Sequence, residues 1–332
     1  MLASDTVVTR RGGLVGGAVL GSLCLWLAFR DVDWRQLWAA IASLHVGYAL
    51  GALGCVIAAL VTVVLRWREL FTTGRNLGFW NLLQATVVGQ ALNIALPIRV
   101  GEIGRWQVLV RAEGLPRTAV LATLVVEKGL DLLTLGLVTG LLVAASILPQ
   151  DLAGRAGVRA GLAAAALFAL WGLGRLRRVW LPSMKRLATS VPERWRGGLG
   201  RAIDESGAVV TALGTTWRGL TIAALSLAVV ALSALANYLL MRAFGLTLPF
   251  QAALVLFVVL QVGAVPPSLP GRLGVFNYLT VLTLSQYGVA PSIGLSYSVA
   301  LYVVAMLSKL VWGTFYLVRG DLWREMRTDL VA

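Results

Sequence analysis

The sequence predicts an all-α protein that crosses a membrane several times. Of its 332 residues, 58% are hydrophobic and only 13% are charged, and the mean hydropathy is +0.81. This composition is too apolar for a soluble domain of the same length. Several apolar stretches approach or exceed the roughly 20 residues that a helix needs to cross a bilayer. We therefore expect a single transmembrane domain over residues 1–332, with about six full spans and two broken helical hairpins.

The expected spans follow one another along the chain and are separated by short polar segments. They lie at 12–29, 46–65, 118–148, 158–174, 219–243 and 292–318. Two further apolar stretches, 80–110 and 249–287, are each interrupted near the middle by proline and glycine. Because proline removes a backbone donor and disrupts a helix, each stretch should form two helical arms. These hairpins are either re-entrant or fully spanning.

The basic residues predict how the chain is oriented. The net charge is +14, and the basic residues gather in short segments between apolar stretches. If each hairpin returns to the side that it entered from, these segments share one side, which is the cytoplasmic side by the positive-inside rule. The loop with Arg66 and a basic amphipathic stretch at about 175–215 belong to it, and the segment 30–45 belongs to the other. We expect a bacterial or archaeal cytoplasmic membrane protein with both termini cytoplasmic and no nucleic-acid partner.

Residue types that serve metal and redox chemistry are scarce. His45 is the single histidine, and Cys24 and Cys55 each lie within an apolar stretch, where a thiol behaves as a small hydrophobe. The sequence also lacks a phosphate-binding loop motif for nucleotide hydrolysis. We therefore expect no metal site, no cofactor and no catalytic residue, and a transporter-like protein rather than an enzyme.

A short motif repeats at the two breaks. Residues 96–101 read Leu-Pro-Ile-Arg-Val-Gly, and residues 269–274 read Leu-Pro-Gly-Arg-Leu-Gly. Three of the expected spans, an odd number, separate the two hairpins, so the two copies should have opposite orientations. Opposed interrupted helices are typical of transporters built from inverted repeats.

The two breaks are suited to binding an anion. The second arm of a hairpin begins its helix at the break, where its first N–H groups are unpaired and the helix dipole is positive. Arg99 at one tip and Arg272 at the other add planar, permanently charged guanidinium groups that match phosphate oxygens. The expected guest is an anionic headgroup.

Polar and ionisable residues at membrane depth are the candidate substrate contacts, because such residues are costly in hydrocarbon and are usually functional. The candidates are Asn93, Pro97, Arg99, Gly101, Glu102, Arg105, Glu127, Lys128, Asp131, Pro270, Gly271, Arg272, Gly274, Asn277 and Lys309. Glu127 and Asp131 are four residues apart and share a helix face. The alternative is a structural network of ion pairs that locks the hairpin to a helix and needs no substrate. Amides such as Asn93 also often join helices.

The same residues carry a resemblance to a known family. Asn93, Pro97, Arg99, Gly101-Glu102 and Arg105 are followed by Glu127-Lys128-x-x-Asp131 and then by Pro270-Gly271-x-Leu273-Gly274-x-Phe276. This order resembles the flippase-like membrane family that includes the transmembrane half of lysylphosphatidylglycerol synthase, the multiple peptide resistance factor. The resemblance covers about residues 10–320. It implies a lipid-translocating domain, which in that relative moves an aminoacylated phospholipid between leaflets.

Two residues depart from the family pattern. Arg272 stands where the family usually has glycine, and Asn277 stands where it usually has glutamate. An added positive charge and a missing carboxylate favour a more anionic cargo than an aminoacyl lipid. The sequence also ends without a soluble synthetase domain, so we expect any lipid-modifying enzyme to be a separate protein.

Together these observations predict a flippase that moves a phosphate-bearing lipid or glycolipid by alternating access at two opposed hairpin tips. We expect its partners to be anionic membrane lipids. Two alternatives come from other functional classes. One is a membrane-embedded transferase or phosphatase in which Glu127 and Asp131 hold a divalent ion. The other is a scaffold for a lipid-modifying enzyme.

Overall fold

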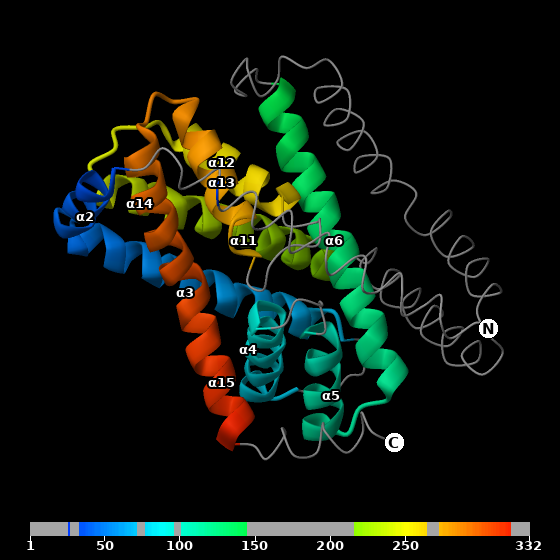
Figure 1. Cartoon of the computed structure of the whole chain (residues 1–332). Coiled ribbons are helices and arrows are strands. Elements are labelled where there is room, and N and C mark those ends of the chain that lie inside the picture. Colours follow the sequence, from blue (N-terminus) through cyan, green and yellow to red (C-terminus); the bar gives the residue numbers. More distant parts are fainter. Residues whose placement is uncertain are drawn as a thin grey trace, which may run out of the picture. The chain divides into compact units, whose positions relative to one another are not determined.

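The computed structural model describes residues 26, 33–71, 77–95, 101–144, 216–263 and 272–319 (Figure 1). These residues form helices and short connections, with no strand among them, which confirms the all-α prediction. The helices are α2 (Trp34–Ala42), α3 (Val46–Glu69), α4 (Phe79–Ala95), α5 (Gly101–Glu113), α6 (Arg117–Ala144), α11 (Thr216–Ala243), α12 (Phe250–Gly263), α13 (Val275–Ser285), α14 (Pro291–Tyr302), the π-helix η3 (Val303–Leu307) and α15 (Ser308–Arg319).

The predicted spans that fall within the described residues are helical. Helices α3 and α11 are each long and apolar enough to cross a membrane. Helix α6 has 28 residues and carries charged side chains in its middle, and the last predicted span is divided into α14, η3 and α15. The predicted spans 12–29, except Trp26, and 158–174, together with the basic stretch 175–215, lie outside the described residues.

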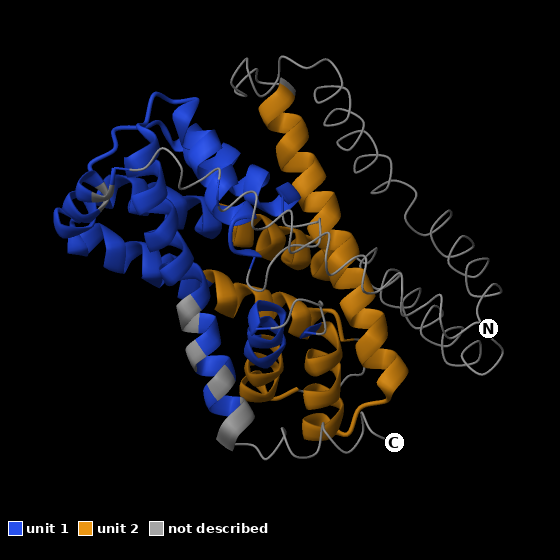
Figure 2. Ribbon diagram, in the orientation of Figure 1, with its two compact units in different colours: residues 1–58, 87–101, 232–332 blue, residues 59–86, 102–231 orange. Residues whose placement is uncertain are grey.

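The chain folds into two compact units, each built from segments that are distant in the sequence (Figure 2). Unit 1 comprises residues 1–58, 87–101 and 232–332. Unit 2 comprises residues 59–86 and 102–231. Helices α3, α4 and α11 each contribute residues to both units.

The core of unit 1 forms where α11 to α14 pack on the first half of α3. It is apolar, with members such as Ala52, Leu240 and Leu256 from three different helices. Tyr297 and Asn237 satisfy buried polar groups of this core across helices. The Tyr297 hydroxyl donates to the Asn237 carbonyl at 3.0 Å, and the Asn237 amide donates to the Ala253 carbonyl at 3.4 Å. Asn237 thus joins α11 to α12 and α14, a structural role that is common for amides in membrane helices.

The segment 30–45, predicted to be a loop, contains the helix α2. Asp33 is its N-cap, and its carboxylate accepts from the Arg35 and Gln36 N–H groups at 2.9 and 3.4 Å. The Asp33 N–H donates to the Ser292 hydroxyl at 3.2 Å, which fixes the start of α2 beside α14. A nine-residue helix is marginal alone, so these tertiary contacts explain why the local pattern did not predict it.

The first broken stretch forms two antiparallel arms, α4 and α5. At one end, Glu113 accepts from the Gly78 N–H at 2.9 Å and from the Asn81 amide at 2.8 Å. At the other end, the Gly101 N–H donates to the Asn93 side-chain oxygen at 2.8 Å. Both ends of the hairpin are therefore fixed by side chains that satisfy otherwise unpaired donors.

The second broken stretch forms α12 and α13, which pack together in unit 1. Gly263 near the end of α12 lies against the Leu279 side chain, which would have to move to admit a Cβ at this position. Helix α13 begins after Gly274, whose φ of 84° is readily adopted only by glycine. The Gly274 N–H donates to the Asn277 side-chain oxygen at 3.4 Å, and the Asn277 amide donates to Ser298 at 3.0 Å.

Candidate functional site

The charged residues of unit 2 come from three helices. Arg66 and Trp67 lie in the last turn of α3. Glu102 and Arg105 lie in the first two turns of α5, three residues apart. Helix α6 contributes the remaining charged residues from its middle: Glu127, Lys128 and Asp131.

The buried part of this cluster is a pair of arginines with their carboxylates. Arg105 donates to both oxygens of Glu127, at 3.0 and 2.9 Å, and both side chains are at most 5% exposed. Arg66 is equally buried; its Nη2 lies 2.6 Å from Asp131 and 3.8 Å from Glu127. Its Nη1 donates to the Ser226 hydroxyl of α11 at 3.3 Å. Bidentate and charge-assisted bonds of this kind are the strong ones.

The exposed part of the cluster centres on Lys128. Its ammonium lies 3.1 Å from Glu102 and 3.9 Å from Asp131. Glu102 in turn lies 3.5 Å from Arg105, which connects this part to the buried part. The side chains of Lys128, Asp131 and Glu102 are 51, 41 and 35% exposed, so a ligand can reach them.

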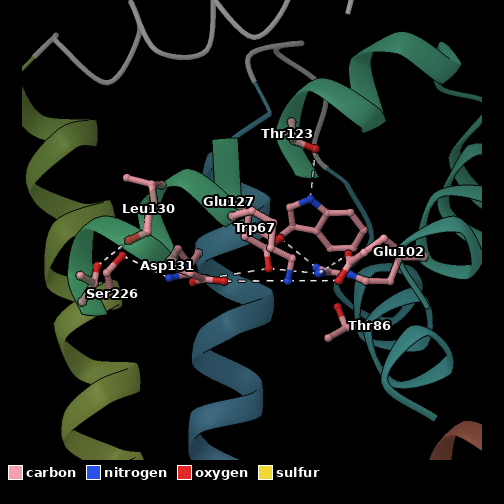
Figure 3. Close-up of polar contacts among 12 residues, drawn as sticks. Trp67, Thr86, Glu102, Thr123, Glu127, Leu130, Asp131 and Ser226 are labelled. Atoms are coloured by element: carbon pink, nitrogen blue, oxygen red, sulfur yellow. Dashed lines mark hydrogen bonds and ion pairs between the residues drawn. The ribbon is translucent and has the colours of Figure 1, made fainter. Parts of the chain in front are cut away.

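These contacts close into a ring in which positive and negative groups alternate. The charge ring consists, in order, of Glu102, Arg105, Glu127, Arg66, Asp131 and Lys128. Figure 3 shows Glu102, Glu127 and Asp131 with dashed lines for their polar contacts and with the Trp67 ring nearby. Three cations face three anions, so the ring is neutral when all six groups are ionised.

The distances around the charge ring also alternate. Each cation has one near carboxylate at 2.6–3.1 Å and one farther carboxylate at 3.5–3.9 Å. A small shift can therefore exchange partners around the ring without leaving any charge unpaired. This property matters at low dielectric, because removing one partner of a buried pair costs several kcal/mol.

Trp67 holds the buried part of the charge ring in place. The guanidinium carbon of Arg105 lies 4.1 Å from the centroid of the Trp67 ring, a cation–π contact. The indole N–H donates to the Thr123 hydroxyl of α6 at 3.1 Å, and the Trp67 side chain is fully buried. One residue of α3 therefore positions both the arginine of α5 and the start of α6.

Replacing Trp67 should separate these two roles. Trp67→Phe keeps an aromatic face for Arg105 but removes the hydrogen bond to Thr123, and we expect it to lower stability by about 1 kcal/mol. Trp67→Leu also removes the cation–π contact and aromatic volume, and the expected loss is about 3 kcal/mol. The thermal midpoint of the purified protein measures both. Equal losses for the two variants would contradict a stacking role.

The structure brings together five of the sequence-predicted site residues in the charge ring and adds Arg66. Arg66 was predicted to lie in a cytoplasmic loop, and this prediction was wrong, because α3 continues to Glu69 and buries the arginine. The sequence contained one indication that the helix continues past Arg66, because its neighbours Leu65 and Trp67 extend the apolar pattern of the span. Pro97, Arg99, Pro270 and Gly271 lie outside the described residues.

The other predicted contacts belong to unit 1, and several have structural partners. Asn93 and Asn277 each cap the start of a second hairpin arm, at Gly101 and Gly274. In each hairpin, one backbone N–H group that was expected to bind an anion thus donates to an asparagine side chain instead. Whether any of these residues also contacts a substrate stays a prediction.

Arg272 and Lys309 are the remaining predicted contacts, and both lie in unit 1. Arg272 lies in the turn before α13 and has a positive φ of 62°, uncommon for a residue with a side chain. Lys309 lies near the start of α15, directly after the π-helix η3. Single-turn π-helices are frequent at functional sites.

Comparison with known families identifies the chain. The family described as "Lysylphosphatidylglycerol synthase TM region" matches residues 14–313. The chain belongs to this family. Its membership shows a membrane protein with a lipid-related function and confirms the resemblance seen in the motifs. Comparison with curated proteins gives no match.

Membership in the lysylphosphatidylglycerol synthase TM region family changes how the charge ring is interpreted. Arg66, Arg105 and Glu127 are buried in helices of a membrane protein, where ionisable groups are rare and face protein or water. All six ring residues fall within the matched range. The ring therefore lies within the region that matches the family, and it is our main candidate site.

Proposed function

We propose that this protein is a lipid flippase that moves a phosphate-bearing headgroup between the leaflets of a cytoplasmic membrane. The observation that carries the proposal is the charge ring, which is buried on one side and exposed on the other. A fully buried network would be closed to a headgroup. A neutral ring with an open side offers charged groups to a headgroup. When a ring cation binds the headgroup, the carboxylate that it leaves can pair with a neighbouring cation.

The exposed part of the ring supplies a mechanism. A lipid phosphate competes with Glu102 and Asp131 for the Lys128 ammonium, because all three are anionic oxygen ligands. Glu102, released from Lys128, moves toward its second cation, Arg105, and Asp131 keeps its near partner, Arg66. The headgroup is bound while the ring stays paired, and the acyl chains remain in the bilayer.

Orientation and energy source complete the proposal. Both termini are cytoplasmic by the positive-inside rule. The broken tips of the two hairpins are accessible first from one leaflet and then from the other. The membrane potential supplies about 2.3 kcal/mol per charge per 100 mV, enough to bias an anionic lipid. Membrane lipids are the partners.

Translocation in proteoliposomes tests this function. Wild-type protein should move a fluorescent phosphate-bearing lipid between leaflets, and Lys128→Gln and Glu102→Gln should each slow it by about tenfold or more, the effect of losing one charge-assisted contact. Arg218→Gln is the matched control, because Arg218 is an exposed residue of unit 2 outside the ring. The control should transport at the wild-type rate.

Two results would contradict the proposal. Wild-type protein that moves no lipid across a broad panel would leave the ring as a structural network or the protein as a scaffold. Lipid movement that both ring variants preserve would remove the ring from the mechanism. The enzyme alternative needs Glu127 to bind a divalent ion, and both of its oxygens already accept from Arg105. A metal-dependent rise in stability, abolished by Asp131→Asn, would revive it.

A further inference from the structure

We propose that the exposed edge of the charge ring opens sideways into the bilayer, and that an acyl chain of the phosphate-bearing lipid lies along the α6 stripe. The α6 stripe consists of Leu121, Val125, Lys128 and Leu132. The inference deepens the proposed function and rests on it for the lipid phosphate that binds at Lys128. It adds a lipid chain as a second feature that the protein recognises.

The four residues of the α6 stripe lie on one face of the helix. They are spaced four, three and four residues apart, which is the repeat of a single helix face. The three apolar members, Leu121, Val125 and Leu132, are 38, 42 and 66% exposed. Glu127, on a different side of α6, is buried in the charge ring. Helix α6 therefore presents one apolar face outward and holds the ring with another.

Lys128 is the charged member of the stripe. It lies between Val125 and Leu132, and its side chain is half exposed. A cation that faces hydrocarbon is costly unless a polar partner lies next to it, and Glu102 and Asp131 provide that partner in the structure. Because apolar residues border Lys128 in both directions along the helix, a ligand that reaches the ammonium along this face contacts them as well.

Helix α5 has a similar apolar residue at the edge of the ring. Ile103 follows Glu102 directly in the sequence and is 50% exposed. Exposed apolar residues mark contact with a partner or a membrane, and this chain belongs to a membrane protein family. A water-filled entrance would instead be lined by polar side chains. We therefore place lipid chains next to the exposed edge of the ring on both helices.

The length of α6 places Lys128 deep in the bilayer. Arg117 begins the helix, and its guanidinium lies 5.7 Å from the centroid of the Trp106 ring. Tryptophan and arginine are typical of the interface between membrane and water. A helix along the bilayer normal then places Lys128 about 16 Å deeper at 1.5 Å per residue, close to half of the roughly 30 Å hydrocarbon core. A headgroup at Lys128 is half-way between the leaflets, where its chains lie against apolar helix faces.

An acyl chain fits the α6 stripe better than a second protein helix does. Helices in membranes pack on one another mainly through small residues, whereas the apolar members of the stripe are leucine and valine. Lys128 at its centre also requires an anion once Glu102 leaves it. A lipid supplies the phosphate and the chain in one molecule, so both parts of the surface are matched by one ligand.

Photolabelling of the full-length protein in a nonionic detergent tests this docking surface. The probe is a phosphatidic acid with a diazirine in the middle of one acyl chain, and the diacylglycerol with the same chain is its phosphate-free counterpart. Mass spectrometry locates the labelled residues. Lys128→Gln removes the headgroup contact. Leu227→Gln is the matched control for changes in the stripe, because Leu227 is 51% exposed on the spanning helix α11.

We expect the phosphatidic acid probe to label the α6 stripe of the wild-type protein, and Lys128→Gln to lower this labelling by about tenfold. Labelling around Leu227 should not depend on Lys128, because surrounding lipids reach α11 without the ring. Labelling by the diacylglycerol probe should not depend on Lys128 at either helix. Stripe labelling that Lys128→Gln leaves unchanged would overturn the proposal, as would a stripe without label. A disulfide-linked dimer formed by Leu132→Cys, and not by the wild type, would assign the stripe to a second copy.

Affinity separates the chain contact from the headgroup contact. The probes are dioctanoyl phosphatidic acid and glycerol 3-phosphate, and the Kd follows from the shift of the thermal midpoint with probe concentration. Leu132→Gln should weaken binding of the lipid by about fivefold, the loss of part of one leucine's apolar contact, and should leave the Kd of glycerol 3-phosphate unchanged. Leu132→Met and Leu227→Gln should keep both Kd values. Equal Kd values of the two probes in the wild type would overturn the proposal, as would an unchanged lipid Kd in Leu132→Gln.

Transport in proteoliposomes separates this proposal from the proposed function. Labelling of the stripe that depends on Lys128, in a protein that moves no lipid, would preserve the docking surface and end the flippase proposal. Wild-type transport by Leu132→Gln, together with a stripe that is not labelled, would preserve the flippase and end the docking surface.

Discussion

Arg105→Leu is expected to destabilise the protein by about 3–5 kcal/mol, because it leaves the Glu127 carboxylate buried without its bidentate partner. Glu127 is only 2% exposed, and its remaining cation, Arg66, lies 3.8 Å away and is engaged with Asp131 at 2.6 Å. The loss of the cation–π contact with Trp67 adds to the effect. Thermal or denaturant unfolding in detergent, with helical content as the signal, measures the change.

A double variant distinguishes a lost ion pair from lost volume. Arg105→Leu combined with Glu127→Leu removes both charges, and buried pairs replaced by apolar residues are often neutral or stabilising. We expect the double variant to recover most of the stability that the single variant loses. Its coupling energy should exceed about 2 kcal/mol. Losses that simply add would mean that the two side chains act independently, contrary to the charge ring.

Gly101→Ala is expected to cost about 3 kcal/mol, the upper part of the range for overpacking. A Cβ at this position would lie closer to the Gly89 carbonyl and to the Asn93 side chain than non-bonded atoms can approach. The arms α4 and α5 must then separate, and the hydrogen bond from the Gly101 N–H to Asn93 weakens as they do. Thermal unfolding of the purified variant measures the loss.

Gly129→Ala is the matched control for that substitution. Gly129 lies within α6, and no atom approaches its would-be Cβ within 4 Å. Alanine is the better helix former, so this variant should gain about 0.5–1 kcal/mol. The opposite signs of the two glycine substitutions follow from packing alone. Destabilisation of both variants by the same amount would point to a general intolerance of glycine replacement.

Local sequence properties predicted the broad architecture. The length of the apolar stretches predicted α3, α6 and α11, and the proline and glycine at residues 96–101 and 264–271 predicted where each hairpin is broken. Five members of the charge ring were also selected, because an ionisable residue inside an apolar stretch is visible without any structure.

Other features depended on tertiary contacts. Arg66 was assigned to a loop because a basic residue at the end of a span usually faces the cytoplasm. Its burial requires Asp131 and Ser226, which are 65 and 160 residues away in the sequence. Helix α2 was missed because its start is fixed by Ser292, 259 residues away from Asp33.

The sequence by itself determined that this chain is a helical membrane protein with two broken helical hairpins, since hydrophobicity, charge and proline act on neighbouring residues. Only the tertiary structure decided that six charged side chains close into a ring. Which charges pair depends on the rotation of each helix about its axis and on the distance between helices. Those quantities are set by the packing of the whole unit, and no local period in the sequence contains them.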